Sequence, residues 1–391
     1  METILKRIRS GIKKIHKEKL YRDPFVFGGI TGRIIKKDGT ELLNFSSNNY
    51  LGLASDRDLI NTIRKTAASR GAGTGASRLI SGTRTTHDEL EKETANIKKR
   101  DAAVFFGSGY AANTGIISSL ARAGDVIYID RLCHASIIDG ARLSGASIRP
   151  FSHCSPASLE MLVRKKAPER PAFVITDSLF SMDGDAAPLF EIAEICEKHG
   201  LFLITDEAHA FGVYGEGGMG LESVNDIYKK IPLTIGTFSK SAGAAGGFAA
   251  GTNEIIDYIK NSARSYFFTT SLPEPCAAAA LTGIKKFPSL ERRRKSLLKN
   301  AAILREGLRS EDLDCGKSSS QIVPLITGSG EKAAALSKYL IKKRIFAPCI
   351  RYPTVKKNAA RLRFSVTASL RKNDIIFLLD SIKKAKNEGI I

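Results

Sequence analysis

A lysine at the end of an apolar run is the first residue in this sequence that could do chemistry. Residues 231–236 are typical of a buried strand, and Thr237-Phe-Ser-Lys240 follows them directly. Burying an ammonium is costly unless it is paired or neutralised, and an imine to an aldehyde cofactor would neutralise it. The small residues at 241–247 would then leave room for a flat ring. A solvated lysine beside a flexible glycine loop is the alternative.

An acid and a histidine follow a second apolar run, residues 201–205. Asp206 could bind a metal, act as a general base, cap a helix or pair with a ring nitrogen. One acid and one histidine without a second cluster make a poor metal site, so we expect no metal. Paired with a pyridinium, Asp206 would keep the ring nitrogen protonated and make the ring an electron sink. His209 would then hydrogen-bond the ring's phenolic oxygen.

A histidine and an arginine end two further predicted strands. His134 follows residues 126–129, where an imidazole can stack on a flat ring and move protons, although a structural histidine is the alternative. Arg351 follows residues 345–350 in a non-helical connection. It can bind a substrate carboxylate through two hydrogen bonds, or it forms a surface salt bridge.

Residues 107–112, Gly-Ser-Gly-Tyr-Ala-Ala, follow a strand pattern and open a helix. They match a loose dinucleotide motif, with Asp125 or Asp130 where a ribose acid would lie, so a nicotinamide dehydrogenase is one alternative. That motif normally opens the first unit of its domain, whereas here it lies about a hundred residues into the chain. Free N–H groups at a helix N-terminus also seat any phosphate, with Ser108 adding a hydroxyl and Tyr110 an aromatic wall.

Short apolar runs alternate with helical patterns through the middle of the chain. The strands are predicted at 103–106, 126–129, 173–176, 201–205, 233–235 and 247–250, and the helices at 109–122, 135–143, 156–166 and 188–199. This alternation predicts an α/β fold with a mostly parallel sheet covered on both faces. Ligands bind at the C-terminal ends of such strands, which is where His134, Asp206 and Lys240 fall.

The two ends of the chain have other patterns. Residues 1–20 predict a basic amphipathic helix, a lid or dimer arm, and short strands are expected at 33–35 and 42–45. A helix is expected at 56–69, and a capping box at 86–89 should open another that runs to about residue 99. After Pro275 we expect helices at 277–310, 331–343 and 372–386 and strands at 321–327, 345–350 and 361–366. The predicted units are an N-terminal helix and arm (1–45), a large α/β domain (46–275) and a smaller α+β domain (276–391).

Composition limits the functional classes. The 391 residues carry a formal charge of +20, but the basic residues are spread out and tryptophan is absent, so we expect no nucleic-acid partner. A basic surface suits a polyphosphate substrate, and a catalytically silent basic binding protein is a further alternative.

The six cysteines are single, and neighbours such as Cys133 and His134 would point to opposite faces of one strand, so reduced thiols are expected. Without a long apolar run or a signal core, we expect no membrane partner and a cytoplasmic location.

The motifs, taken in order, resemble the α-oxoamine synthases, which are pyridoxal-phosphate enzymes with the aspartate-aminotransferase fold (fold type I). The resemblance runs from about Leu20 to Ala368. It rests on residues 44–53 (Asn-Phe-Ser-Ser-Asn-Asn-Tyr-Leu-Gly-Leu), 108–113, 134–136, 180–185, 206–209 (Asp-Glu-Ala-His), 237–240 (Thr-Phe-Ser-Lys) and 351–363. Each motif alone is weak, but the ordered set is specific.

The resemblance implies pyridoxal 5'-phosphate as the cofactor and a role for each matching position. Lys240 would form the imine, His134 would stack on the ring, Asp206 would pair with the pyridine nitrogen, and His209 and Ser181 would contact the ring's oxygen side. Residues expected around the rest of the cofactor and its phosphate are Ser108, Gly109, Tyr110 and Thr237, with Thr269 and Thr270 reaching the phosphate of a neighbouring subunit. A homodimer with a shared active site is therefore expected.

The resemblance also implies a reaction. The family condenses an amino acid with an acyl thioester and releases CO2, and Lys240 would take the Cα proton of the amino acid. Asn48 and Arg351 would hold the amino-acid carboxylate, and Arg22 and Thr354 would contact the acyl substrate, carried by coenzyme A or by a carrier protein. The large domain most resembles the branch that joins alanine to a pimeloyl thioester. Glycine C-acetyltransferase is the alternative within the family.

Overall fold

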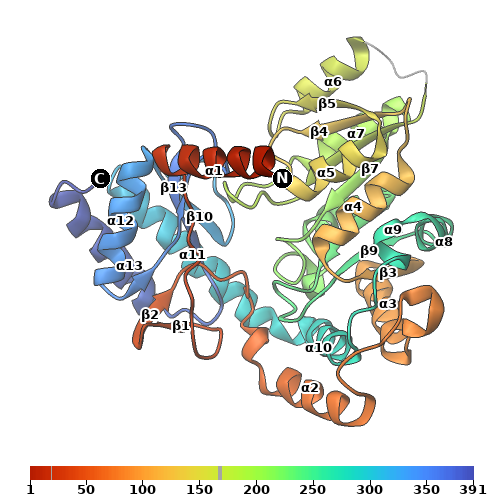
Figure 1. Cartoon of the computed structure of the whole chain (residues 1–391), viewed down its shortest axis with the longest axis horizontal. Helices are drawn as coiled ribbons and strands as arrows, with labels where there is room; N and C mark the ends of the chain where they lie inside the picture. Colours follow the sequence, from red (N-terminus) through yellow and green to blue (C-terminus); the bar gives the residue numbers. More distant parts are fainter. Residues whose placement is uncertain (19, 166–169) are drawn as a thin grey trace.

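A seven-stranded sheet forms the centre of the large domain (Figure 1). The computed structural model describes residues 1–18, 20–165 and 170–391. Only β9 runs antiparallel to its neighbours in this sheet, which confirms the predicted α/β class and mostly parallel sheet. In spatial order the strands are β3 (Ala102–Phe106), β9 (Gly247–Gly251), β8 (Leu233–Thr237), β7 (Phe202–Asp206), β6 (Ala172–Asp177), β4 (Val126–Asp130) and β5 (Ser147–Phe151).

Strand β5 was not predicted from the sequence. It contains Pro150, which cannot donate a ladder hydrogen bond and is tolerated at the edge of a sheet. β5 is the outermost strand, paired only with β4 among the described residues. The other six strands lie within two residues of the predicted ranges.

Side chains alternate between the two faces of the sheet, and a different set of helices packs on each face. Ile127 and Ile129 pack with one cluster and Tyr128 with the other, as the two-residue period of a strand requires. The first face is covered by α4 (Gly109–Leu120), α5 (Ala135–Ser144), α8 (Asn253–Ser262) and α9 (Arg264–Phe267). The second is covered by α6 (Pro156–Lys165) and α7 (Leu189–His199), and residue 166 of the predicted helix 156–166 lies outside the described residues.

Two predicted helical features are corrected by the structure. The N-cap of helix α3 (Thr85–Lys98) is Arg84, two residues before the predicted N-cap Thr86, and the N–H of Arg84 donates to Nδ1 of His87 at 3.1 Å. The hydroxyl of Thr86 instead donates to Glu274 at 2.9 Å. The predicted helix at 277–310 is two helices, α10 (Glu274–Lys285) and α11 (Glu291–Ser310), separated by a turn that contains Pro288.

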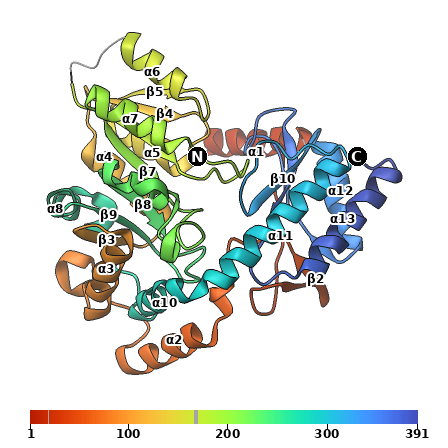
Figure 2. The same cartoon turned by 180° about the vertical axis from the view of Figure 1, so that it is seen from behind.

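The small domain is built on two three-stranded sheets, and α11 runs into it from the large domain (Figure 2). The predicted strand at 345–350 is split at Ala347-Pro348, and its halves join different sheets. One sheet contains β1 (Ile34–Lys37), β2 (Thr40–Asn44) and β11 (Ile345–Phe346), so the N-terminal hairpin pairs with the C-terminal part. The other contains β10 (Ile322–Gly328), β13 (Ala360–Ser365) and β12 (Cys349–Ile350), covered by α12 (Gly330–Lys342) and α13 (Lys372–Asn387).

The N-terminal helix α1 (Glu2–Lys17) is amphipathic as expected, but none of its residues is buried. Its five large apolar side chains, at positions 4, 5, 8, 12 and 15, are 41–54% exposed. Residue 19 of the predicted helix 1–20 lies outside the described residues. In the described part of the chain, no helix has the length and apolarity needed to cross a bilayer. Helix α2 (Arg57–Arg70) packs against α10.

Candidate active site

A cavity of about 210 Å³ lies at the C-terminal ends of the parallel strands. Eight of the residues predicted from the sequence line it together, which follows from their positions at the ends of β4, β7 and β8 and at the start of α4. They are Ser108, Gly109, Tyr110, His134, Asp206, His209, Thr237 and Lys240. The sequence motifs therefore converge on one site, although Ser108 and Lys240 are separated by 132 positions in the sequence.

Lys240 projects its amine against His209, with Nζ 2.9 Å from Nε2. Burial lowers the pKa of Lys240 to about 8, although the nearby carboxylate of Asp206 acts in the opposite direction. An amine with this pKa is partly unprotonated near neutral pH, so it can attack an aldehyde or accept a proton.

His209 links this amine to a buried chain of hydrogen bonds. Burial, followed by the positive charges of Lys240 and Arg363, lowers the pKa of His209 well below its usual range, so its imidazole is neutral. A neutral ring carries one N–H, and Nε2 accepts from the Lys240 ammonium, which assigns the proton to Nδ1. Nδ1 then donates to the Tyr50 oxygen at 2.7 Å, and the Tyr50 hydroxyl donates to Asn48 Oδ1 at 3.1 Å.

Asp206 faces the cavity beside a second carboxyl group, on the neighbouring strand. Its two oxygens accept hydrogen bonds from Asn113 Nδ2 at 2.7 Å and from the N–H of Ala208 at 2.8 Å, so it shapes a turn and does not cap an α-helix. Burial and the charge of Asp206 raise the pKa of Asp177 to about 8. Asp177 therefore keeps its proton at neutral pH and adds no second negative charge beside Asp206.

His134 lies between β4 and α5, and its ring lines the cavity. Cys133 and His134 were expected on one strand, but both lie in this connection, and the Cys133 thiol donates to the carbonyl of Ile175. His134 Nδ1 accepts from the N–H of Ser136 at 3.3 Å, which fixes the ring at the N-terminus of α5. Burial lowers the pKa of His134, so the ring is neutral.

The start of α4 forms an anion site at one end of the cavity. The N–H groups of a first helical turn have no partner within the helix and attract negative charge. Ser108 caps α4 by accepting from the N–H of Ala111 at 3.0 Å. The hydroxyls of Thr237 and Ser239 lie 2.8 Å from each other and line the same cavity.

The small residues after Lys240 have a different purpose from the one predicted. None of residues 242–247 lines the cavity, so they do not provide clearance beside a ring. A Cβ on Gly243 would lie 2.4 Å from the backbone of Ala54, and one on Gly247 would lie 2.5 Å from the carbonyl oxygen of Ser108. These glycines allow the chain to pack closely against the backbone that carries the site.

Several predicted site residues lie outside the cavity. Thr269 and Thr270 line a separate small pocket with Gly107, and they do not reach Lys240 within one chain. Arg22 donates to the Thr354 hydroxyl at 2.9 Å, and Arg351 donates to the carbonyl of Tyr21 at 2.9 Å. These three residues line another cavity, of about 390 Å³, whose wall includes Phe25 and Phe346.

Sequence reasoning did not assign a role to Arg363, which is 5% exposed on β13. Its Nη2 lies 3.3 Å from Asn48 Oδ1 and 3.5 Å from the Tyr50 hydroxyl, and Nε donates to the carbonyl of Ser181. Among the residues that the structure describes, no carboxylate forms an ion pair with it. Neither Arg363 nor the predicted site residue Asn48 lines the 210 Å³ cavity, but Tyr50 connects both of them to His209, which does. A buried cation without a carboxylate partner is suited to bind an anion. The signal in the sequence was the pair Arg361 and Arg363, two positions apart in a buried strand.

The chain matches the family described as aminotransferase class I and II over residues 40–382. It is 39% identical over 375 residues to a protein of Bacillus cereus (strain Q1) that is named "Putative 8-amino-7-oxononanoate synthase", covering 96% of this chain and 95% of that protein. A Bacillus anthracis protein of the same name is 38% identical, with 97% of each covered.

Solved structures agree with this match. A serine palmitoyltransferase variant from S. paucimobilis, with bound PLP–myriocin aldimine, is similar with a TM-score of 0.92 and 29% identity over 100% of this chain and 99% of that chain. 8-Amino-7-oxononanoate synthase from Francisella tularensis is similar with a TM-score of 0.78 and 30% identity over 90% and 99%. The chain belongs to the α-oxoamine synthases. Like its relatives, this α-oxoamine synthase is a pyridoxal-phosphate-dependent enzyme of fold type I.

The cavity fits that cofactor. Hydroxyls and helix N–H groups at one end suit a phosphate, Asp206 suits a protonated ring nitrogen, and Lys240 suits the aldehyde. The dehydrogenase alternative fails, because neither predicted ribose acid is available. Asp125 accepts from the N–H of Arg122 at 2.9 Å, and Asp130 is paired with His153 at 2.9 Å. The alternative of a silent binding protein is also wrong, since the family is enzymatic.

Proposed function

We propose that this α-oxoamine synthase condenses L-alanine with a pimeloyl thioester to give 8-amino-7-oxononanoate, CO2 and the free thiol, a step of biotin biosynthesis. The observation that carries the proposal is the match, at 38–39% identity over nearly the whole of both chains, to proteins that bear the name of this enzyme. The solved serine palmitoyltransferases, at 29–30% identity, and the solved 8-amino-7-oxononanoate synthase, at 30%, are equally similar in sequence, so the proposal depends on the 38–39% matches.

The proposed chemistry gives each residue of the cavity a part. Bound pyridoxal phosphate supplies an aldehyde that joins amino groups and a protonated ring that withdraws electrons from the Cα of the amino acid. We assign Asp206 to hold the proton of the ring nitrogen and His134 to lie against the ring. Ser108, Gly109, Tyr110 and Thr237 surround the phosphate end. The role of Ser181 would be its carbonyl contact to Arg363, since Ser181 does not line the cavity.

Lys240 acts as the base in this proposal. With the amino group of alanine joined to the bound cofactor, the free amine of Lys240 would remove the Cα proton, and the pKa of about 8 makes it a base near neutral pH. The Cα would then bond to the thioester carbonyl as the carbon–sulfur bond breaks, and the leaving thiolate would take a proton from solvent. After loss of CO2, Lys240 would return the proton that it removed to Cα. His209 stays neutral and keeps the amine in place through Nε2.

Two substrate sites are proposed. Arg363 together with Asn48 binds the carboxylate of alanine, and this assignment takes over the part expected for Arg351. Arg22, Thr354 and Arg351 take the acyl thioester in the 390 Å³ cavity, whose aromatic side chains suit a methylene chain. Thr269 and Thr270 would reach the phosphate in a second copy, so the proposed enzyme is a homodimer. We place it in the cytoplasm, where its cysteines stay reduced.

Thiol release by the purified holoenzyme tests the proposal. Alanine with pimeloyl-CoA or with pimeloyl-carrier protein should release thiol faster than glycine with acetyl-CoA or serine with palmitoyl-CoA. The product should contain the alanine Cα but not its carboxyl carbon, which is checked with carboxyl-labelled alanine. Faster turnover of glycine with acetyl-CoA would assign the enzyme to glycine C-acetyltransferase, and faster turnover of serine would assign it to serine palmitoyltransferase.

A further inference from the structure

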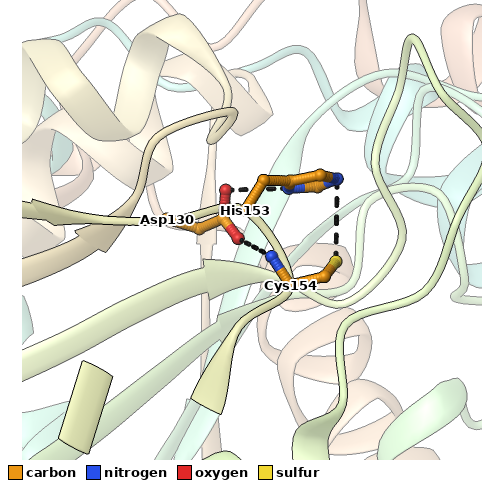
Figure 3. Close-up of side chains that lie close together, drawn as sticks. All are labelled: Asp130, His153 and Cys154. Atoms are coloured by element: carbon orange, nitrogen blue, oxygen red, sulfur yellow. Dashed lines mark hydrogen bonds and ion pairs between the residues drawn. The ribbon is translucent and has the colours of Figure 1, made fainter. Parts of the chain in front are cut away.

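A histidine outside the cavity is held between two carboxylates. His153 follows β5, and its Nδ1 lies 2.9 Å from Asp130 Oδ1, at the end of β4 (Figure 3). Its Nε2 lies 2.9 Å from Asp185 Oδ2. The His153 side chain is 21% exposed, whereas that of Asp130 is 1% exposed. His153 therefore ties the end of the central sheet to the segment that carries Asp185.

The two carboxylates favour the protonated form of the His153 ring. Burial disfavours the charged ring, but the hydrogen bonds to Asp130 and Asp185 outweigh it and raise the pKa of His153 to about 12. Both ring nitrogens therefore carry protons and donate them. Asp130, His153 and Cys154 have the atom types of a metal site. A protonated imidazole has no lone pair for a metal, so we assign this cluster to hydrogen bonding.

Asp185 shapes a loop that reaches the small domain. The loop is closed by hydrogen bonds from the N–H of Ala187 to Ser178 and from the N–H of Phe180 to Asp185, each at 3.0 Å. Its tip, residues 181–184, packs on β10 and β13. Gly184 has a φ of +70°, and a Cβ there would lie 2.0 Å from the carbonyl oxygen of Ile322.

The same tip holds both arginines of β13. Arg361 donates to Asp183 Oδ1 at 2.6 Å, and Arg363 donates through Nε to the carbonyl of Ser181. Nη2 of Arg363 is directed to Asn48 and to Tyr50, whose hydroxyl contacts His209 of the cavity wall. The rings of His153 and Phe180, next to Ser181, also pack in a T-shaped arrangement, with centroids 4.3 Å apart and planes at 87°. A continuous set of contacts thus connects His153 to the guanidinium of Arg363.

We propose that His153 is a positioning residue for substrate binding. By holding Asp185, it fixes the loop at 178–187 so that the carbonyl of Ser181 orients Arg363 toward the carboxylate of the amino acid. This inference rests on the proposed function, because it takes Arg363 as the carboxylate site. It predicts that loss of His153 weakens recognition of the carboxylate and leaves recognition of the amino group intact.

A pair of ligands tests this prediction. Alanine and ethylamine differ in the carboxylate, and binding of each to the holoenzyme is measured from the absorbance change of the cofactor. We expect His153→Gln to weaken alanine binding about tenfold and to leave ethylamine binding within about twofold. His199→Gln is the matched control, because the side chain of His199 is 22% exposed and, among the residues that the structure describes, its ion pair is with Glu160, at 3.9 Å. It should change neither affinity. Cofactor content and Tm are measured for each variant.

Each outcome decides between a positioning role and a general structural one. Equal weakening of alanine and ethylamine, or no weakening of either, would overturn the inference. Asp185→Asn provides a second test should His153→Gln not fold, and it should reduce alanine affinity selectively. Where wild-type absorbance responds to serine or glycine but not to alanine, the proposed substrate is wrong. The His153 comparison is then made with that amino acid and its decarboxylated amine, with the same criterion.

Discussion

Nζ of Lys240 and Nε2 of His209 lie 2.9 Å apart at the base of the cavity. This contact joins the amine to a chain of buried hydrogen bonds that continues through Tyr50 and Asn48 to Arg363. The proposed base and the proposed carboxylate site are therefore parts of one network, although they come from different domains. A change at one member should be felt by the others.

Tyr50→Phe tests the middle of this network. Tyr50 is fully buried, and its hydroxyl is the partner of both His209 and Asn48. Its loss leaves Nδ1–H of His209 without an acceptor, which should cost about 1–3 kcal/mol of stability. We expect a lower urea midpoint and a kcat reduced about tenfold, since the imidazole no longer holds Lys240 in place. Tyr258→Phe, at a side chain that is 55% exposed, should change neither value. An unchanged midpoint in Tyr50→Phe would contradict the assigned hydrogen bonds.

Cofactor uptake by the cofactor-free protein should report the pKa of Lys240. Because burial lowers this pKa to about 8, the unprotonated amine that reacts with an aldehyde increases as the pH rises and is nearly complete by about pH 9. The rate of the absorbance change on adding pyridoxal phosphate should rise with pH in proportion to the unprotonated fraction of Lys240. An ordinary lysine would give a rate that still rises above about pH 10.

Asp206→Asn provides an internal check on the pH dependence of cofactor uptake. The negative charge of Asp206 favours the ammonium form of Lys240, so its removal should move the midpoint to lower pH. A midpoint that moves to higher pH would contradict the proposed electrostatics of the site.

The sequence was sufficient for six of the seven strands of the central sheet and for bringing together the residues around Lys240. Both follow from local patterns: apolar runs of strand length, and polar residues placed directly after them. It was insufficient for β5, whose Pro150 is acceptable only because the strand is at an edge. Edge position is a property of the assembled sheet.

The substrate end of the site was harder to predict for a related reason. Arg351 follows a predicted strand whereas Arg363 lies within one, but these local patterns do not show which of the two is buried near Asn48. The structure does, because Arg351 is held by the carbonyl of Tyr21 in the N-terminal arm, while Arg363 is buried beside Asn48. The partners that hold the two side chains, the carbonyl of Ser181 for Arg363 and that of Tyr21 for Arg351, are both distant in sequence.

Gly184→Ala tests the contact between this loop and β10. An alanine would have an unfavourable backbone conformation, with a φ of +70°, and a steric clash, with its Cβ 2.0 Å from the Ile322 carbonyl oxygen. Gly200→Ala is a matched control, because Gly200 has a φ of +63° and nothing within 4 Å of a Cβ. The control should lose about 1 kcal/mol of unfolding free energy, from the backbone conformation alone. Gly184→Ala should lose at least about 2 kcal/mol more in the same urea titration. Equal losses would mean that the loop moves away from β10 without cost.

The two arginines can be separated by kinetics. Arg363→Lys keeps a positive charge but removes the bidentate geometry of the guanidinium, so KM for the amino acid should rise about 100-fold while KM for the acyl thioester changes little. Arg351→Lys should raise KM for the acyl thioester and change KM for the amino acid little. Arg351 lines the 390 Å³ cavity with Arg22 and Thr354 and contacts the carbonyl of Tyr21. Initial rates measured with each substrate varied in turn give both values. If Arg351→Lys raises KM for the amino acid and Arg363→Lys does not, the carboxylate site is at Arg351, as the sequence pattern first indicated. Arg363 would then be a buried cation whose charge serves only to keep His209 neutral and the pKa of Lys240 low.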